Sequence, residues 1–288
     1  MAARIVALME AVAWITGAGG LIGSQIVRAA PGEWRARGLT RADFDLTDFA
    51  AVRAVFVREK PQLVIHCAAM SKTLECERNP ERARLNNIEV TRVLNELASD
   101  IPLLFFSTDL VFDGLKGNYS ENDAPNPINV YAETKLAAEK IVLANPKHSA
   151  IRTSLNAGHT RNGTAFNEQW RTVWQRGGTL NLFTDEFRSP IAASVTARAI
   201  WELVAANQPG LYHLAGRERL SRHDIGRLLA AQDPKLNARI EPGSIRDYTN
   251  MRRSPDTSLD CAKIQRLLSF PLQKFSDWLR ENPRALEA

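Results

Sequence analysis

The chain has 288 residues, 44% hydrophobic and 24% charged, which is typical of a globular protein with one large domain, or a domain with an attached lobe. Its net charge of +5 comes from scattered basic residues that form no nucleic-acid-binding run, and no stretch reaches the roughly 18 apolar residues of a membrane span. Cys67, Cys76 and Cys261 are too dispersed for a disulfide framework or a metal site and fit a reducing cytoplasm. We read the apolar start, Met1 to Ala13, as a short extension rather than a signal peptide, because Glu10 breaks it.

A glycine-rich stretch follows the first predicted strand. Residues 11–15 are a short apolar run typical of a buried central strand, and residues 25–30 predict a helix. Between them, Gly17, Gly20 and Gly23 form G-x-x-G-x-x-G rather than G-x-G-x-x-G. Glycines let backbone N–H groups approach a pyrophosphate, and a helix N-terminus favours its negative charge. The alternative is a turn without a ligand, but the flanking strand and helix favour a dinucleotide site.

The end of the second predicted strand, Trp34 to Leu39, bears on the choice of dinucleotide. An acidic residue at this point binds the adenosine ribose, whereas an arginine accommodates a 2′-phosphate. Arg41 therefore favours NADP, while the nearby Asp43 leaves NAD open. Asp45, shortly before the next predicted helix, is well placed to reach an adenine edge.

A third buried strand is predicted over residues 62–66, and small side chains follow it. Cys67, Ala68 and Ala69 stand at its carboxyl end, where ligands bind in open α/β sheets. Their small size would let a cofactor lie close to the backbone. We interpret His66, at the end of the strand itself, as a core histidine rather than a catalytic one.

The third and fourth strands are separated by a predicted polar loop over residues 71–77 and a long helix over residues 80–99. Asn87 lies in this helix and either holds the cofactor loop or faces solvent. The fourth strand, over residues 102–106, leads to Thr108. A hydroxyl at the carboxyl end of a central strand can donate a hydrogen bond to a substrate carbonyl. A simple strand-end cap is the alternative for this residue.

Tyr131 and Lys135 follow a loop over residues 118–129 that is rich in Pro, Asn and Asp. A helix places residues at i and i+4 on one face, so the ammonium would lie close to the phenol. A nearby positive charge lowers the pKa of a tyrosine, which could then exchange a proton with a substrate oxygen near neutral pH. Taken alone, the pair would fit a solvated helix face. The glycine loop and Thr108 favour a catalytic pair instead.

The alternation of strands and helices predicts an α/β fold with a Rossmann-type doubly wound parallel sheet and a smaller C-terminal substrate lobe. We assign residues 1–155 to the dinucleotide-binding domain. Residues 156–288 form mainly the substrate-binding lobe, with some segments returning to the main sheet. Within it, Phe166, Trp170 and Trp174 form an i, i+4 stripe that we expect to pack the lobe onto the main domain rather than to stack on a sugar.

The glycine loop, Ser107-Thr108 and Tyr131-x-x-x-Lys135 stand in the order found in the short-chain dehydrogenase/reductase superfamily, and the chain resembles its extended branch. The string Ser-Thr-Asp-Leu-Val-Phe-Asp-Gly over residues 107–114 resembles dTDP-4-dehydrorhamnose reductases more narrowly, as does Tyr-Ala-Glu-Thr-Lys-Leu-Ala-Ala-Glu over residues 131–139. Three later segments are similar to landmarks of the same group: residues 185–190, 211–216 and 252–260.

The resemblance implies roles for individual residues. Thr108, Tyr131 and Lys135 would be the catalytic triad, and Lys135 would also bind the nicotinamide ribose. The implied pyrophosphate contacts are Gly17, Gly20, Leu21 and Ile22. Asp45 and Leu46 would lie at the adenine, and Cys67, Ala68 and Ala69 along the ribose and pyrophosphate. No metal ion is implied.

Two positions depart from the pattern of these reductases. Leu155 follows Arg152-Thr153-Ser154 where a tryptophan is typical, and Leu74 stands where their Thr-x-Val-Asp-x-x-Glu segment has its aspartate. Both changes would touch the sugar side of the site. They leave hydride chemistry intact and leave the identity of the sugar open.

We therefore expect an NAD(P)H-dependent reductase of a nucleoside-diphosphate 4-keto-6-deoxy sugar, with NADP(H) preferred and NAD(H) as the alternative cofactor. Arg188, Arg252 and Arg253 are candidates for the diphosphate, since arginine pairs bidentately with phosphate, although each could also be a surface residue. The competing functions are a sugar-nucleotide epimerase or dehydratase, and a non-catalytic NADP-binding regulatory subunit like that of methionine adenosyltransferase. We expect a cytoplasmic protein without nucleic-acid or membrane partners, with a homodimer left open.

Overall fold

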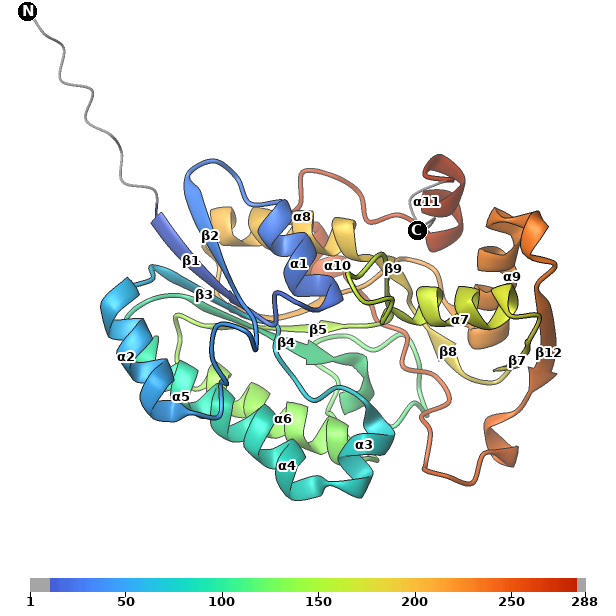
Figure 1. Cartoon of the computed structure of the whole chain (residues 1–288), viewed down its shortest axis with the longest axis horizontal. Helices are drawn as coiled ribbons and strands as arrows, with labels where there is room; N and C mark the ends of the chain where they lie inside the picture. The colour runs from blue at the N-terminus through green and yellow to red at the C-terminus, as the bar shows by residue number, and fades with distance from the viewer. Residues whose placement is uncertain (1–10, 284–288) are drawn as a thin grey trace, which may run out of the picture.

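A computed structural model describes residues 11–283, and its central feature is one six-stranded parallel sheet (Figure 1). The strand order is β10-β5-β4-β3-β1-β2. The strands are β1 (Ala11–Thr16), β2 (Trp34–Leu39), β3 (Leu63–His66), β4 (Leu103–Thr108), β5 (Ser149–Thr153) and β10 (Gly210–Leu214). The order reverses between β1 and β3, so a ligand crevice is expected at the carboxyl ends of these two strands. The predicted doubly wound sheet is confirmed. Of the extension predicted over Met1 to Ala13, residues 1–10 lie outside the described residues, and residues 11–13 belong to β1.

Helices cover both faces of the sheet (Figure 1). One face carries α1 (Leu21–Arg28), α8 (Ala193–Ala206) and α10 (Ala262–Gln265). The other carries α2 (Phe49–Glu59), α5 (Val90–Leu97) and α6 (Val130–Leu143). Successive residues of a strand point to opposite faces, so Ile15 packs under α1 and α8 whereas Trp14 packs toward α2 and α5. Burial on both faces explains why the central strands β1, β3 and β4 are nearly continuous apolar runs rather than alternating ones.

The region between β3 and β4 differs from the prediction in two ways. Residues expected as a polar loop form a short helix, α3 (Thr73–Arg78), because Cys76 is buried against Met70. A single buried position gives too little periodicity to predict a helix from sequence. The predicted long helix is divided into α4 (Pro80–Arg84), a π-helical turn (Leu85–Glu89) and α5.

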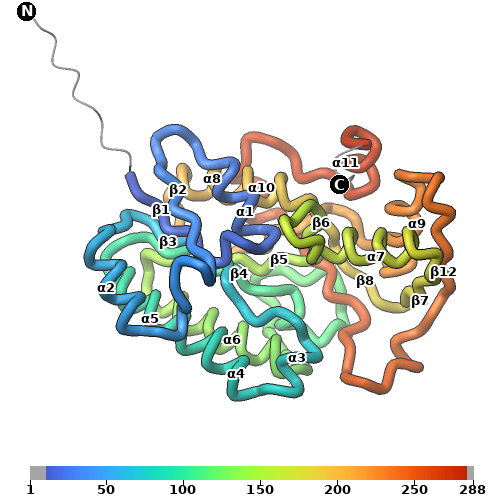
Figure 2. The backbone as a smooth tube through the Cα atoms, viewed as in Figure 1, coloured from blue at the N-terminus to red at the C-terminus, as the bar shows by residue number. Residues whose placement is uncertain are grey.

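A second hydrophobic core lies beyond β5. It contains α7 (Phe166–Gln175), α9 (Arg222–Gln232), α11 (Phe275–Glu281) and the parallel pair β7 (Thr179–Phe183) and β12 (Arg239–Gly243). Figure 2 shows the orange β12 and α9 beside α7 and β7, which come much earlier in the chain. Two further pairs are β6 (Asn156–Ala157) with β9 (Ile191–Ala192), and β8 (Phe187–Arg188) with β11 (Leu220–Ser221).

The aromatic stripe of α7 serves this second core. Trp170 and Trp174 are buried with Leu182, Ile225 and Trp278, which all belong to the same core. The prediction that the stripe packs this part of the chain onto the main sheet is therefore wrong, because the stripe faces α9 and α11 instead. None of the described helices combines the length and the apolar composition needed to cross a bilayer.

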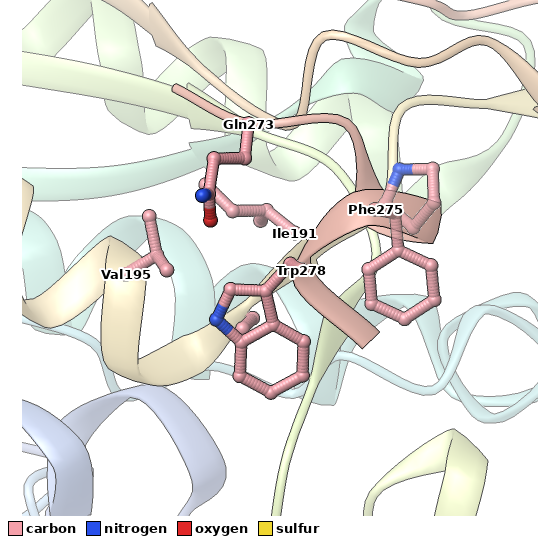
Figure 3. A pocket seen from close by; sticks show the side chains of 7 residues that line it. Ile191, Val195, Gln273, Phe275 and Trp278 are labelled. Atoms are coloured by element: carbon pink, nitrogen blue, oxygen red, sulfur yellow. The ribbon is translucent and has the colours of Figure 1, made fainter. Parts of the chain in front are cut away.

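A small cavity marks the place where α8 and α11 meet (Figure 3). Its walls include Ile191, Val195, Gln273 and Trp278. The cavity measures about 10 Å³, which leaves room for about one water molecule. It is therefore a packing void and not a substrate site.

Candidate active site

The structure brings Thr108, Tyr131 and Lys135 to the carboxyl edge of β4, where α6 packs against that strand. The start of α6 is held from two sides. The Asn129 side chain accepts a hydrogen bond of 2.9 Å from the N–H of the residue after Tyr131, and Glu77 accepts one of 2.7 Å from the N–H of the residue before it. Tyr131 and Lys135 are thereby fixed one turn apart above the sheet, as their spacing predicted.

Thr108 is tied to a buried acidic neighbour. Its hydroxyl accepts a hydrogen bond from the Leu110 N–H and donates one to Asp109 Oδ1, both at 3.2 Å. The second carboxylate oxygen of Asp109 accepts from the hydroxyls of Ser154 and Thr257, both at 2.8 Å. Asp109 is 4% exposed, and burial raises the pKa of its carboxyl, while the charge of Arg188 and the three hydroxyl hydrogen bonds act in the opposite direction. The carboxylate thus joins the ends of β4 and β5 to a segment near the C-terminus.

The electrostatics of the pair differ from the expectation. Burial raises the pKa of Tyr131 above its ordinary value, the charge of Asp109 raises it further, and the Thr108 hydroxyl acts in the opposite direction. Burial also lowers the pKa of Lys135 to about 7, with opposing contributions from Cys67 and Glu139. The predicted lowering of the tyrosine pKa by Lys135 is therefore not found, because burial disfavours both charged forms. The phenol stays protonated at neutral pH, which is the form that can donate a proton.

Lys135 is buried against the sheet. Its side chain is 2% exposed, and Nζ lies 3.9 Å from the centre of the Phe105 ring on β4. A buried amine next to an aromatic face is held in one position and loses its hydration, which explains the direction of its pKa shift.

The glycine loop fits the close approach of a dinucleotide. Gly17 has φ +68°, and a side chain there would place Cβ 2.7 Å from the Ala68 N–H nitrogen, so the loops after β1 and β3 touch backbone to backbone. A Cβ on Gly23 would collide with the carbonyl of Gly17. Helix α1 begins after Gly20 without a side-chain cap, so its first N–H groups are available to an anion. These residues fit a pyrophosphate.

The other residues predicted to contact the cofactor surround this loop. Leu21 and Ile22 open α1 and are half-buried, as are Cys67, Ala68 and Ala69 after β3. Leu46 packs beside the hydrophobic core under α2. At the end of β4, Ser107 Oγ is buried without a hydrogen-bond partner among residues 11–283. A buried hydroxyl left unpaired at this edge is consistent with a site shaped for a ligand.

The structure separates the roles of Arg41 and Asp43. Asp43 pairs with Arg37 at 2.8 Å and accepts hydrogen bonds from Thr40, and these bonds, those of Thr40 foremost, hold the pKa of its carboxyl below the usual value. Arg41 is exposed and has no ion pair in the described part of the chain. Asp45 accepts two hydrogen bonds of 2.9 Å from Thr47, which lower its pKa. The Asp43 carboxylate is therefore occupied by Arg37 and Thr40, and Arg41 is available to a phosphate.

Two of the three candidate arginines for a diphosphate are already paired. Arg188 is buried in an ion pair with Glu186 and lies 3.8 Å from Asp109. Arg253 holds the two carboxylate oxygens of Glu186 at 2.8 and 2.9 Å. Arg252 is exposed. Arg188 and Arg253 thus form a cluster of ion pairs around Glu186, which the sequence did not reveal.

Arg222 is a candidate that the sequence reading missed. Its guanidinium lies 4.9 Å from the Trp170 ring and 5.6 Å from Phe166, and within residues 11–283 it has no ion pair or side-chain hydrogen bond. Burial lowers its pKa to about 10, so it remains charged at neutral pH, while the charge of Glu186 raises that pKa. Arg222 is the first residue of α9, where the helix dipole disfavours a cation. This unusual position is the one feature of the sequence that could have indicated a binding role for it.

Two buried polar residues predicted near the site are also placed. The Asn87 side chain accepts from the Met70 N–H at 2.8 Å and donates to the Met70 carbonyl at 3.1 Å. It therefore holds the loop after β3 and does not face solvent. His66 is fully buried, which confirms it as a core histidine.

The parallel sheet with its glycine loop, and the Thr108, Tyr131 and Lys135 side chains at its carboxyl edge, form the arrangement typical of NAD(P)-dependent oxidoreductases of the short-chain dehydrogenase/reductase type. Within that class the assignment can be narrower. Residues 12–286 match the RmlD substrate binding domain, and the chain belongs to that family.

Named relatives include both reductases and a regulatory subunit. The probable low-salt glycan biosynthesis reductase Agl14 of Haloferax volcanii is 33% identical over 232 residues, covering 74% of this chain and 77% of the relative. The dTDP-4-keto-6-deoxy-D-glucose reductase of Streptomyces niveus is 31% identical over 237 residues, covering 79% and 81%. Methionine adenosyltransferase 2 subunit beta of Xenopus laevis is 28% identical over 273 residues, covering 88% and 82%.

Solved structures share the fold over nearly the whole chain. A hypothetical dTDP-4-dehydrorhamnose reductase from Sulfolobus tokodaii has a TM-score of 0.80 at 30% identity, covering 93% of this chain and 98% of that one. The dTDP-4-dehydrorhamnose reductase of Bacillus anthracis, solved in complex with NADP, has a TM-score of 0.88 at 22% identity, covering 95% and 98%. At the lower identity the likeness is one of fold.

Proposed function

We propose that this protein is an NADPH-dependent reductase of the 4-keto group of a nucleoside-diphosphate 6-deoxy sugar. The observation that carries the proposal is the meeting of Thr108, Tyr131 and Lys135 at the carboxyl edge of β4, next to β3, where the strand order reverses. The reductases among its relatives support the same reaction class.

The proposed mechanism assigns one task to each residue. The bound nicotinamide would supply a hydride to the keto carbon. Thr108 would donate its hydroxyl hydrogen bond to the carbonyl oxygen, where negative charge develops. Tyr131, kept protonated by burial, would give its proton to that oxygen. Lys135 would hold the ribose hydroxyls from its fixed position above Phe105.

The cofactor would lie along the carboxyl edge of the sheet. The residues proposed to bind it are Gly17, Gly20, Leu21, Ile22, Arg41, Asp45, Leu46, Cys67, Ala68, Ala69, Tyr131 and Lys135. NADP(H) is proposed over NAD(H), since Asp43 is occupied by Arg37 and Thr40 while Arg41 is exposed. We propose residues 1–155 as the dinucleotide-binding domain and 156–288 mainly as the substrate-binding lobe.

The sugar nucleotide would bind between these two parts. Arg222 supports this placement because a partly buried guanidinium without a direct ion pair in the described chain favours an anionic ligand. Leu155 packs against the second core, which includes Trp170 and Trp174 of α7. A leucine in place of tryptophan there would alter the fit of the sugar rather than the hydride transfer.

The direct test is oxidation of NADPH and NADH with dTDP-4-keto-6-deoxyglucose and with its epimer. We expect turnover with NADPH, and a loss of about 10²-fold or more in Tyr131→Phe, since a positioned general acid contributes at least that much. Tyr248→Phe, which changes a tyrosine away from β4, is the matched control. Full turnover by Tyr131→Phe would refute the mechanism.

Two other results would assign the protein to a competing function. NADPH binding without turnover, together with co-elution with a methionine adenosyltransferase catalytic subunit, would indicate a regulatory subunit. Copurified, tightly bound NAD(H) and no net oxidation would indicate an epimerase or dehydratase. We further propose a cytoplasmic location, because Cys67, Cys76 and Cys261 are free thiols, and no nucleic-acid partner. Light scattering of the purified chain tests the homodimer.

A further inference from the structure

Three fully buried polar side chains form a hydrogen-bonded row, the file, that crosses the sheet below the proposed cofactor site. Thr16 ends β1, His66 ends β3, and Thr91 lies on α5; each is 0% exposed. Thr16 Oγ1 is 2.7 Å from His66 Nδ1, and His66 Nε2 is 3.0 Å from Thr91 Oγ1. The two ends are also bonded. The Ala68 N–H donates to Thr16 Oγ1 at 3.2 Å, and Thr91 Oγ1 donates to the Asn87 carbonyl at 2.8 Å.

The chemistry of the groups fixes the direction of every bond in this file. A carbonyl can only accept, so the single hydroxyl proton of Thr91 is committed to Asn87. Thr91 must then accept from His66, which places the imidazole proton on Nε2. The unprotonated Nδ1 accepts from Thr16, whose oxygen accepts in turn from the Ala68 N–H. All donors point the same way, an arrangement in which hydrogen bonds strengthen one another.

The opposite tautomer would lose one of these bonds. With the proton on Nδ1, Thr16 Oγ1 would accept from both His66 and Ala68, and its own proton would have no acceptor. Thr91 would have to donate to Nε2 and release the Asn87 carbonyl. A buried unsatisfied hydroxyl is costly, so the Nε2–H tautomer is favoured.

The file continues to the helix that carries Tyr131 and Lys135. The side chain of Asn87, in the π-helical turn, donates to Thr134 Oγ1 at 2.9 Å. Thr134 Oγ1 donates in turn to the Tyr131 carbonyl at 2.7 Å. Asn87 and Thr134 are each 1% exposed, so these bonds are shielded from water. One chain of contacts therefore leads from the residue before Gly17 to the backbone of Tyr131.

We propose that His66, locked as the neutral Nε2–H tautomer, is a positioning residue. It fixes the glycine loop and the stretch after β3 relative to the helix that carries Tyr131 and Lys135. This inference rests on the proposed function for its catalytic meaning. It assigns no contact with substrate or cofactor to His66. These hydrogen bonds would hold the glycine loop and α6 at a fixed distance from each other.

The surroundings of His66 keep it neutral. Burial, together with the charge of Lys135, lowers the pKa of His66 to about 3. Both residues pack near Phe105, whose ring centre is 5.7 Å from the imidazole and 3.9 Å from Lys135 Nζ. A charged imidazole would also break the file, because Thr16 would then lack an acceptor.

The tautomer can be measured directly in the wild-type protein. In histidine labelled with ¹⁵N, Nδ1 and Nε2 differ in chemical shift according to which of them carries the proton. We expect the His66 signals to show an unprotonated Nδ1 and a protonated Nε2 throughout the neutral range. A protonated Nδ1, or titration of His66 near the ordinary histidine pKa, would overturn the proposal.

The positioning role is tested by a double-mutant cycle. Thr16→Val and Thr91→Val each remove one end of the file with little change of shape. Loss of one net hydrogen bond corresponds to about a tenfold weakening of NADPH binding for either variant. The double variant should be hardly weaker than the singles, because breaking one end already releases His66. Additive losses would overturn the proposal, since only coupled sites depart from additivity.

A matched control separates this role from general destabilisation. Thr172 makes the same type of bond as Thr91, donating at 2.9 Å to the carbonyl four residues earlier, but in α7. Thr172→Val should leave NADPH affinity unchanged; an equal loss would refute a specific role for the file. If the wild type bound neither NADPH nor NADH, the proposed function would fail. The tautomer and the same cycle, measured by urea unfolding, would still decide whether the coupled file exists.

Discussion

Thr108 donates its hydroxyl proton to the carboxylate of its neighbour Asp109, at 3.2 Å. This is the same proton that the proposed mechanism offers to the sugar carbonyl, so the carboxylate competes with the substrate for it. Asp109 also raises the pKa of Tyr131. One buried carboxylate therefore acts on two of the three proposed catalytic groups.

The charge of Asp109 can be removed without changing its shape. In Asp109→Asn, the phenolate is no longer disfavoured by a neighbouring negative charge, so the pKa of Tyr131 falls. Tyr131 is active when protonated, and we expect the high-pH loss of kcat/KM to begin at a lower pH than in the wild type. A pH–rate profile measures this. Asp100→Asn, on a side chain that is 92% exposed, is the control; an unmoved alkaline limb in Asp109→Asn would contradict the assignment.

Lys135 is predicted to destabilise the ligand-free protein at neutral and lower pH. Its pKa falls from 10.5 to about 7 on folding. Below about 7 both states carry the proton and the penalty is complete, whereas between about 7 and 10.5 only the unfolded chain holds it, so stability rises with pH. Lys135→Met should therefore gain a few kcal/mol near pH 6, since each pKa unit corresponds to about 1.4 kcal/mol.

The gain in Lys135→Met should shrink as the pH approaches 10, and the variant should lose turnover. Urea unfolding at several pH values measures the difference in free energy. Lys140→Met, on the exposed side of α6, is the control and should show no such dependence. A gain that is independent of pH would show that Lys135 is not buried as an ammonium.

Arg41 is expected to determine the preference for NADPH. Arg41→Ser removes a guanidinium that is exposed beside the end of β2, and hydrogen bonds to charged groups contribute about 1.5–3 kcal/mol. We expect NADPH to bind about 10- to 100-fold more weakly, with NADH affinity nearly unchanged. Fluorescence titration of both cofactors measures this, with Arg58→Ser on α2 as the control. Equal losses for both cofactors would exclude a contact with the 2′-phosphate.

Arg222 is expected to act on the sugar nucleotide and not on the cofactor. Arg222→Gln should raise KM for the sugar nucleotide by roughly tenfold or more, as expected for loss of a charge-assisted hydrogen bond, and leave the NADPH dissociation constant unchanged. Arg227→Gln, further along α9 on an exposed position, is the control. If only NADPH binding weakened, Arg222 would belong to the cofactor side.

Local patterns in the sequence were sufficient for the frame of the fold. Apolar runs marked β1, β3 and β4, and the spacing of Tyr131 and Lys135 placed them on one helix face, because strand and helix periods are local properties of the chain. Ser221 and Asp224 form a capping box at the start of α9, which is another local pattern of residues three apart. The short helix α3 was not predicted because Cys76 is its one buried residue, and a single buried residue gives no periodic pattern.

Only the tertiary structure determined which residues of the site are hydrogen-bonded to one another. Asp109 and Thr257 are 148 residues apart, and Thr16 and His66 are 50 apart, yet each pair is hydrogen-bonded. No periodicity relates such positions, so their contacts exist only once the sheet and the second core have assembled. The direction of the Tyr131 pKa shift has the same origin. The i, i+4 spacing predicted an ammonium nearby, but burial of the phenol and the charge of Asp109 dominate, and both depend on the folded surroundings.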